Sequence, residues 1–205
     1  MAGRIVLIAG NMFSGKSQDL IERVKAVSDY RHHRILCFKP DIDTRTPGMI
    51  RGRNGEFLPA FEVPWKHPEM IFSRLHEEEK KGVFYGTLVF DEVQFYPTDS
   101  NFYGLIGKLL ETRDIFAAGL LLNFRGEPFG STSSLIAGYA RSTTVYRDSY
   151  CNYKECGAIA PYPQRLHKDG TPSSWNEKEI LIDSGANYEP RCPKHFELPG
   201  RPDYV

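Results

Sequence analysis

The turn from Gly10 to Ser17 constrains the fold of this chain more than any other segment. Its sequence, GNMFSGKS, is a glycine, four further residues and then Gly-Lys-Ser. An apolar run at residues 5–9 precedes it, and apolar residues recur at helical spacing over residues 17–28, which predicts a strand, a turn and a helix. In that context the backbone amides of the turn and the positive end of the helix face one anion. The segment therefore predicts a phosphate-binding loop rather than a chance match.

Two side chains of this loop have specific roles in the pattern. Lys16 is expected to reach the outer phosphates of a nucleotide, and the Ser17 hydroxyl is expected to face Mg²⁺. The other residues of the predicted ATP-binding segment are Gly10, Asn11, Met12, Phe13, Ser14 and Gly15. The sequence thus predicts ATP and Mg²⁺ as ligands.

Strands and helices alternate in the prediction for the first 148 residues. Short apolar runs at residues 35–38, 87–90 and 115–122 predict further strands, and residues 69–81 and 102–112 predict helices. Residues 41–64, rich in Gly, Pro, Asp and Arg, predict loops with short extended pieces. This alternation predicts an α/β fold with a doubly wound parallel sheet.

A change in composition near residue 148 predicts a domain boundary. After Tyr146 cysteine, proline and glycine become frequent and helical periodicity fades. We therefore expect a P-loop nucleotide-binding domain at residues 1–148. A small zinc-binding domain is expected at residues 149–205.

Charge and hydropathy exclude some partners. The chain has 26 Lys plus Arg and 26 Asp plus Glu, giving a formal net charge of +0, which argues against a general electrostatic grip on nucleic acid or acidic lipid. No apolar run approaches the roughly 20 residues of a membrane span. The apolar run at residues 5–9 is too short for the core of a signal peptide. We therefore expect a cytoplasmic protein with neither nucleic acid nor membrane as partner.

Two adjacent carboxylates, Asp91 and Glu92, follow the predicted strand at residues 87–90. The carboxyl ends of strands in open α/β sheets are where ligands bind. Asp91 is expected to hold Mg²⁺, and Glu92 to act as general base on an acceptor hydroxyl. Gln94, Phe95 and Tyr96 nearby, and Phe124 further on, suit a flat nucleobase, although the aromatic side chains are equally typical of a core.

Three cysteines and a histidine form two pairs with metal-compatible spacing. Four residues separate Cys151 from Cys156, and two separate Cys192 from His195. Three thiolates and one imidazole fit a closed, tetrahedral, structural Zn²⁺ site. A disulfide would leave the third cysteine unpaired, and a reducing compartment disfavours it. Cys37, inside an apolar run, is interpreted as a core residue.

The order of these motifs resembles the type II (cytosolic) thymidine kinases, from Ile5 to about Phe196. The resemblance rests on the phosphate loop, residues 39–45 (KPDIDTR), residues 91–95 (DEVQF), residues 124–129 (FRGEPF), and Tyr188 before Cys192. It implies transfer of the ATP γ-phosphoryl group to the 5′-hydroxyl of thymidine, with Glu92 as general base. It also implies that Asp43, Arg45 and Gln94 lie at the nucleotide or substrate site.

The resemblance further implies how the nucleoside is held. The implied substrate-binding residues are Met12, Phe95, Leu120, Phe124, Leu181, Ile182, Asp183 and Tyr188. A zinc-anchored loop at roughly residues 175–188 is expected to close over the nucleoside. The family is commonly tetrameric and inhibited by the triphosphate end product, so a homotetramer is expected.

Several positions depart from the family pattern. Leu121 stands where the family often has Asp, Pro163 where a Thr is usual, and Asp183-Ser184 where a Gly pair is usual. The first cysteine pair is spaced by four residues instead of the usual two. These changes lie at the base end of the expected site. A deoxynucleoside kinase of altered or relaxed base specificity is therefore the first alternative.

A P-loop ATPase that uses its zinc module to bind a partner is the second alternative. A nucleic-acid partner would favour a basic zinc region with interleaved aromatic residues. Residues 173–190 instead contain Glu177, Glu179, Asp183 and Glu189, and this acidic content disfavours that version.

Overall fold

A six-stranded parallel sheet forms the centre of the computed structural model, which describes residues 3–139, 143–181 and 187–203. The strand order is β5-β2-β6-β7-β1-β8, and every neighbouring pair is parallel. The strands are β1 (Ile5–Gly10), β2 (Ile35–Pro40), β5 (Phe61–Val63), β6 (Thr87–Phe90), β7 (Asp114–Leu120) and β8 (Thr143–Arg147).

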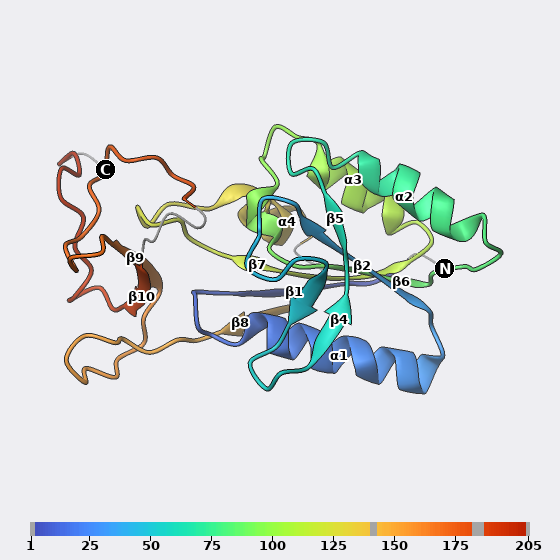
Figure 1. Cartoon of the computed structure of the whole chain (residues 1–205), viewed down its shortest axis with the longest axis horizontal. Helices are drawn as coiled ribbons and strands as arrows, with labels where there is room; N and C mark the ends of the chain where they lie inside the picture. Colours follow the sequence, from blue (N-terminus) through green and yellow to red (C-terminus); the bar gives the residue numbers. More distant parts are fainter. Residues whose placement is uncertain (1–2, 140–142, 182–186, 204–205) are drawn as a thin grey trace.

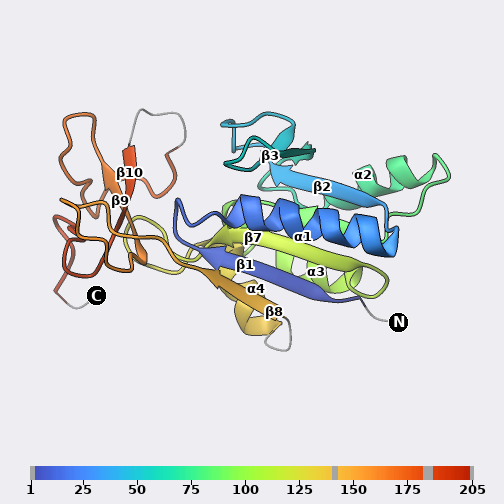
Figure 2. The same cartoon turned by 90° about the horizontal axis from the view of Figure 1, so that it is seen from below.

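Helices cover both faces of this sheet (Figures 1 and 2). Helix α1 (Lys16–Arg31) lies on one face. Helices α2 (Met70–Glu79), α3 (Phe102–Leu109) and α4 (Gly130–Gly138) lie on the other. The predicted doubly wound α/β fold is therefore confirmed.

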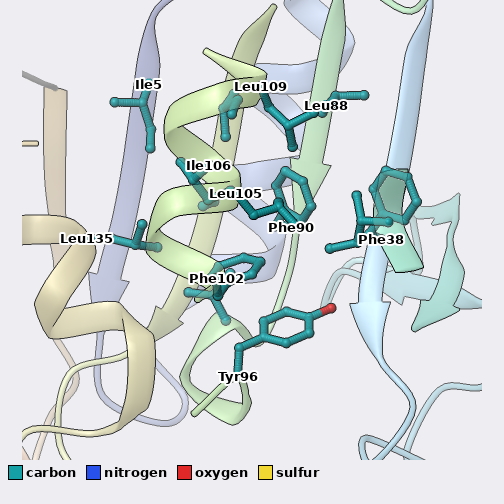
Figure 3. Close-up of a cluster of buried hydrophobic side chains, with 14 of the residues drawn as sticks. Ile5, Phe38, Leu88, Phe90, Tyr96, Phe102, Leu105, Ile106, Leu109 and Leu135 are labelled. Carbon is teal, nitrogen blue, oxygen red and sulfur yellow. The ribbon is translucent and has the colours of Figure 1, made fainter. Parts of the chain in front are cut away.

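The two faces of β6 explain why its sequence is apolar without alternation. Leu88 and Phe90 point into the cluster that includes Phe102 of α3, shown in Figure 3. Val89 points the other way, into the cluster that includes Ile21 of α1. Because both faces are covered by helices, every position of the strand is buried, as parallel sheets require.

Aromatic packing fixes the segment that follows β6. The ring of Tyr96 stacks on Phe102 with centroids 4.2 Å apart, and Phe102 meets Phe90 edge to face at 5.8 Å. Tyr96 is fully buried and comes directly after the short 3₁₀ helix η1 (Val93–Phe95). This packing holds the turn after β6 against the end of the sheet (Figure 3).

Two elements of the first 148 residues, α4 and β8, are not among those predicted from the sequence. Strand β8 pairs with β1, with Ile8 opposite Val145. Its sequence, TTVYR, carries the β-branched and aromatic residues of a strand. Helix α4, GSTSSLIAG, is rich in poor helix formers. Tertiary contacts override that propensity, since Leu135 is buried and the Ser131 hydroxyl donates to the Tyr96 carbonyl oxygen at 2.8 Å.

Residues 41–64 contain the short extended pieces that were predicted. Strands β3 (Met49–Arg51) and β4 (Phe57–Pro59) form an antiparallel hairpin, and β5 joins the edge of the sheet. Ile50 is buried in the cluster on the α1 face. The β3–β4 hairpin therefore lies beside α1 (Figure 2).

A separate two-stranded antiparallel sheet lies near the carboxyl ends of the central strands (Figures 1 and 2). It consists of β9 (Tyr162–Leu166) and β10 (Asn187–Arg191). A division of the chain into two domains at residue 148 stays a prediction. Within the described ranges, no helix is long and apolar enough to cross a membrane.

Candidate functional site

The turn between β1 and α1 is closely packed. A Cβ atom on Gly10 would lie 2.3 Å from the carbonyl oxygen of Arg147 in β8, so only glycine fits there. Phe13 and Gly15 adopt φ values of 61° and 84°, in the left-handed region that non-glycine residues rarely occupy. The Lys16 ammonium donates to the Asn11 carbonyl oxygen at 2.8 Å. Burial lowers the pKa of Lys16, and the carboxylates of Glu92 and Asp91 oppose this effect.

Asn11 links this loop to a distant part of the chain. Its side-chain amide donates to the carbonyl oxygen of Ala160 at 2.8 Å, and its Oδ1 accepts from the Met12 amide at 2.6 Å. Ala160 is buried beside Cys151 and Cys192. The loop is therefore joined to the cysteine cluster by a buried hydrogen bond.

Asp91 lies opposite the first turn of α1. The Ser17 hydroxyl donates to Asp91 Oδ2 at 2.9 Å, across 74 residues of sequence. Burial, followed by the neighbouring charge of Glu92, raises the pKa of Asp91 to about 7. The hydroxyl and the carboxylate together offer the hard oxygen donors that Mg²⁺ prefers.

Glu92 is held in an unusual backbone conformation. Its φ and ψ are 55° and 38°, a left-handed geometry that costs on the order of 1–3 kcal/mol for a non-glycine residue and concentrates at functional sites. Arg45 Nη2 lies 2.7 Å from Glu92 Oε1, and the Gln94 amide donates to Glu92 Oε2. Gln94 Oε1 in turn accepts from the Leu120 amide at 2.9 Å. The carboxylate of Glu92 is therefore fixed from two sides.

Asp43 positions Arg45. Its Oδ1 lies 2.6 Å from Arg45 Nε, and its Oδ2 lies 3.0 Å from Nζ of the buried Lys39. Burial alone would raise the pKa of Asp43, but Arg45 and Lys39 outweigh burial and lower it. The charge of Glu92 further raises the pKa of Arg45. Lys39 was not predicted as a site residue, although it opens the KPDIDTR segment.

Two cavities meet at Glu92. The larger has a volume of about 940 Å³ and the smaller about 190 Å³. Both are lined by Met12, Phe13, Arg45, Glu92 and Leu120. One carboxylate thus faces the phosphate loop and the larger cavity at once.

The smaller cavity lies over the phosphate loop. The predicted loop residues Met12, Phe13, Gly15, Lys16 and Ser17 line it, together with Gln18, Arg51 and Arg53. Gly10, Asn11 and Ser14 lie buried behind this surface. Asp43, Asp91 and Gln94 are also buried, and their side chains contact those of Arg45, Ser17 and Glu92, respectively.

The walls of the larger cavity are mainly apolar and aromatic. Six of the predicted substrate-binding residues line it: Met12, Phe95, Leu120, Phe124, Leu181 and Tyr188. Ile182 and Asp183 lie outside the described residues. The wall also includes Pro163 and residues that were not predicted, namely Leu122, Asn123, Phe129, Tyr150, Asn152, Glu179, Ile180, Asn187, Glu189 and Pro190.

Arg165 supports the Phe124 wall from behind. Its side chain is fully buried, and its guanidinium carbon lies 3.5 Å from the centre of the Phe124 ring. It donates to the Ser173 hydroxyl at 3.0 Å and to the Lys178 carbonyl oxygen at 2.7 Å. A second arginine, Arg125, donates to the Trp175 and Glu177 carbonyl oxygens at 2.8 and 2.7 Å. The two arginines join residues 173–178 to the cavity wall, and no local motif indicates this role.

The four predicted metal ligands lie together. The ligand atoms of Cys151, Cys156, Cys192 and His195 are all within 4.8 Å of one another. His195 Nδ1 lies 3.4 Å from Cys192 Sγ and 3.6 Å from Cys151 Sγ. Zn–S bonds of about 2.3 Å in a tetrahedron place sulfur atoms about 3.8 Å apart, and Cys156 Sγ lies 4.0 Å from Cys192 Sγ.

Local structure explains the four-residue spacing and the lowered pKa of Cys151. Lys154 and Glu155 adopt φ values of 42° and 59°, which close the turn between Cys151 and Cys156. Burial opposes ionisation of the Cys151 thiol, but backbone hydrogen bonds from Cys192 and Tyr153 outweigh it and lower the pKa to about 6. In contrast, burial raises the pKa of Cys37 to about 12, as expected for a core thiol.

Comparisons with known proteins point to one family. The sequence matches the family model described as thymidine kinase over residues 3–196. A protein named thymidine kinase from Pyrobaculum aerophilum is 34% identical over 95% of this chain and 99% of its own length. Proteins of the same name from Mycoplasmoides gallisepticum and Ureaplasma parvum are 34% and 36% identical, each over 98% of this chain and over 84% and 85% of their own lengths.

Replacement of Arg165 by Met tests its supporting role. The variant removes hydrogen bonds to the Ser173 hydroxyl and the Lys178 carbonyl oxygen. We expect the local stability of this segment to fall by about 1.5–3 kcal/mol, the range for a hydrogen bond to a charged group. Hydrogen exchange should therefore accelerate at the amides of residues 173–181. The control is Arg201→Met, at an exposed position near the C-terminus. Equal exchange rates at residues 173–181 in the two variants would contradict the supporting role of Arg165.

Proposed function

The chain belongs to the thymidine kinase family, and we propose that ATP is the phosphate donor and Glu92 the general base of its reaction. The meeting of two cavities at Glu92 carries this proposal. The smaller cavity suits the phosphates and the larger suits a nucleoside. Donor and acceptor would then meet at one carboxylate.

The phosphate loop holds the donor in this proposal. Lys16 faces the smaller cavity and would pair with the outer phosphates. The buried Ser14 hydroxyl has no hydrogen-bond partner within the described chain, which fits a group that a phosphate oxygen would satisfy.

Asp91 and Ser17 would hold Mg²⁺. Their oxygen atoms lie 2.9 Å apart at the end of β6 and the start of α1, and they offer only hard oxygen donors. When bound, Mg²⁺ neutralises charge on the phosphate oxygens during transfer. A cation there would also keep Asp91 ionised, since burial and Glu92 otherwise raise its pKa to about 7.

Glu92 would accept the proton of the acceptor hydroxyl. The hydroxyl oxygen then forms a bond to the γ-phosphorus while the bond from that phosphorus to the β–γ bridging oxygen breaks, and ADP leaves. Arg45 and Gln94 orient the carboxylate for this step. Arg45 also lines both cavities and supplies positive charge beside the transferred group.

Thymidine would occupy the larger cavity. Met12, Phe95, Leu120 and Phe124 supply apolar and aromatic surface for the base. Leu181 and Tyr188 also line this cavity. Ile182 and Asp183 are proposed beside the base from the family resemblance alone. Nothing within the described residues favours altered or relaxed base specificity, or a P-loop ATPase that uses its zinc module to bind a partner.

A structural Zn²⁺ would organise the C-terminal part of this cavity. Cys192 and His195 follow β10 directly, and Cys151 and Cys156 lie in the turn before β9. The three thiols and one imidazole fit tetrahedral Zn²⁺. With Zn²⁺ bound, the β9–β10 sheet would be fixed relative to the phosphate loop through the Asn11–Ala160 hydrogen bond. A homotetramer and a cytoplasmic location are proposed from the resemblance alone.

Replacement of Glu92 by Gln tests the proposed base. Gln cannot take the proton, so the rate of phosphoryl transfer to thymidine should fall by about 10²–10⁴-fold. ATP affinity should stay close to that of the wild type, since Lys16 and the loop backbone are unchanged. Transfer of the γ-phosphoryl group is measured with labelled ATP, and ATP affinity by equilibrium titration. The control is Glu111→Gln, at an exposed position after α3. A wild-type rate in Glu92→Gln would exclude Glu92 as the base.

Metal analysis tests the zinc proposal. We expect one Zn²⁺ per chain in the purified protein. Cys192→Ser should lose that metal and lower the melting temperature, because a structural zinc site contributes directly to folding. Cys37→Ser removes a thiol outside the cluster and should keep the metal. A wild-type protein with far less than one zinc per chain would refute the site.

A further inference from the structure

Two arginines of the β3–β4 hairpin lie at the phosphate loop. Arg51 ends β3, and Arg53 lies in the turn that follows. Both line the smaller cavity together with Lys16 and Ser17. The sequence of this region predicts only short extended pieces and loops.

Arg53 is bonded to the phosphate loop itself. Its Nη2 donates to the Phe13 carbonyl oxygen at 2.6 Å, and its guanidinium lies 5.6 Å from the centre of the Phe13 ring. Phe13 is 56% exposed, so its ring is not part of the core. The hairpin therefore contacts the outer edge of the loop, on the side that opens to solvent.

The hairpin is also fixed to the first turns of α1. The Asn54 amide donates to Gln18 Oε1 at 3.3 Å, and Lys25 Nζ lies 2.7 Å from Glu56 Oε1. A Cβ atom on Gly52 would lie 2.2 Å from Gln18 Oε1, so the backbone of the turn approaches the helix closely. These contacts hold both arginines beside the smaller cavity.

The charges that line the smaller cavity are unbalanced. Its cations are Lys16, Arg45, Arg51 and Arg53, and its carboxylate is Glu92. The charge of Arg45 is offset by Asp43 and Glu92. Within the described parts of the chain, neither Arg51 nor Arg53 forms an ion pair with a carboxylate. A small cavity lined by uncompensated cations concentrates polyanions.

We propose that Arg51 and Arg53 bind the outer phosphates of the nucleoside triphosphate donor. A guanidinium binds phosphate oxygens with two parallel hydrogen bonds, and both arginines line the smaller cavity beside the phosphate loop. The hairpin would then bind the nucleoside triphosphate more tightly than the diphosphate product. This inference rests on the proposed function, in which the smaller cavity holds the donor.

The test compares the affinities of ATP, ADP and AMP in the absence of any nucleoside. The proteins are the full-length wild type, Arg51→Gln, Arg53→Gln, the double variant and Arg53→Lys. The control is Arg34→Gln, at an exposed position directly before β2. This position lies at the amino ends of the parallel strands, whereas the smaller cavity lies at their carboxyl ends. Titrations are made with Mg²⁺ present, and each variant is checked for wild-type melting.

The double variant should bind ATP about tenfold or more weakly, as expected for the loss of hydrogen bonds to charged groups. ADP affinity should fall less, and AMP affinity should match that of the control. Arg53→Lys should retain part of the ATP affinity, because it keeps the charge but not the fork. An unchanged ATP affinity, or an equal loss for all three nucleotides, would overturn the proposal, since the latter indicates damage to the loop alone.

Failure of this inference is distinguishable from failure of the proposed function. A wild-type protein that binds ATP but phosphorylates no thymidine refutes the function and leaves the titrations interpretable. A double variant with wild-type ATP affinity refutes only the role of the two arginines.

Discussion

A hydrogen bond from the Ser17 hydroxyl to Asp91 joins the phosphate loop to the carboxylate pair after β6, and the rest of the site depends on this contact. The residues are 74 positions apart, and they meet because β1 and β6 run in the same direction in one sheet. The carboxyl ends of parallel strands lie at the same end of the sheet, so the phosphate loop after β1 and the carboxylates after β6 lie side by side. Burial of both sheet faces fixes this register, since a shift of one residue would turn every side chain to the opposite face.

The left-handed backbone of Glu92 follows from the same constraint. Tyr96, stacked on Phe102, holds the turn after β6 against the core, and Gln94 is pinned to the Leu120 amide of β7. The chain must turn sharply between these points, and Glu92 takes the strained conformation. The cost is offset by the surrounding packing, and the result is a carboxylate held between two cavities.

Local motifs made much of this arrangement predictable. The phosphate loop, the carboxylate pair and the two cysteine pairs each depend on short spacings, and the structure brings the predicted residues together. Helix α4 was not predicted because its serines and glycines are poor helix formers, and tertiary contacts such as those of Ser131 and Leu135 stabilise it. Arg165 and Arg53 were missed for a related reason, since their positions depend on contacts between distant segments. Strand β8 did carry a signal, the β-branched run TTVYR, but it lies where the composition begins to change.

The most direct measurement is identification of the phosphorylated product. The wild-type protein is incubated with Mg²⁺, thymidine and ATP labelled in the γ-phosphate, and the product is analysed by mass spectrometry and NMR. One labelled phosphoryl group is expected on the 5′-oxygen of thymidine for each ADP formed. Label recovered only as inorganic phosphate, or an absence of transfer to thymidine, would contradict the proposed reaction.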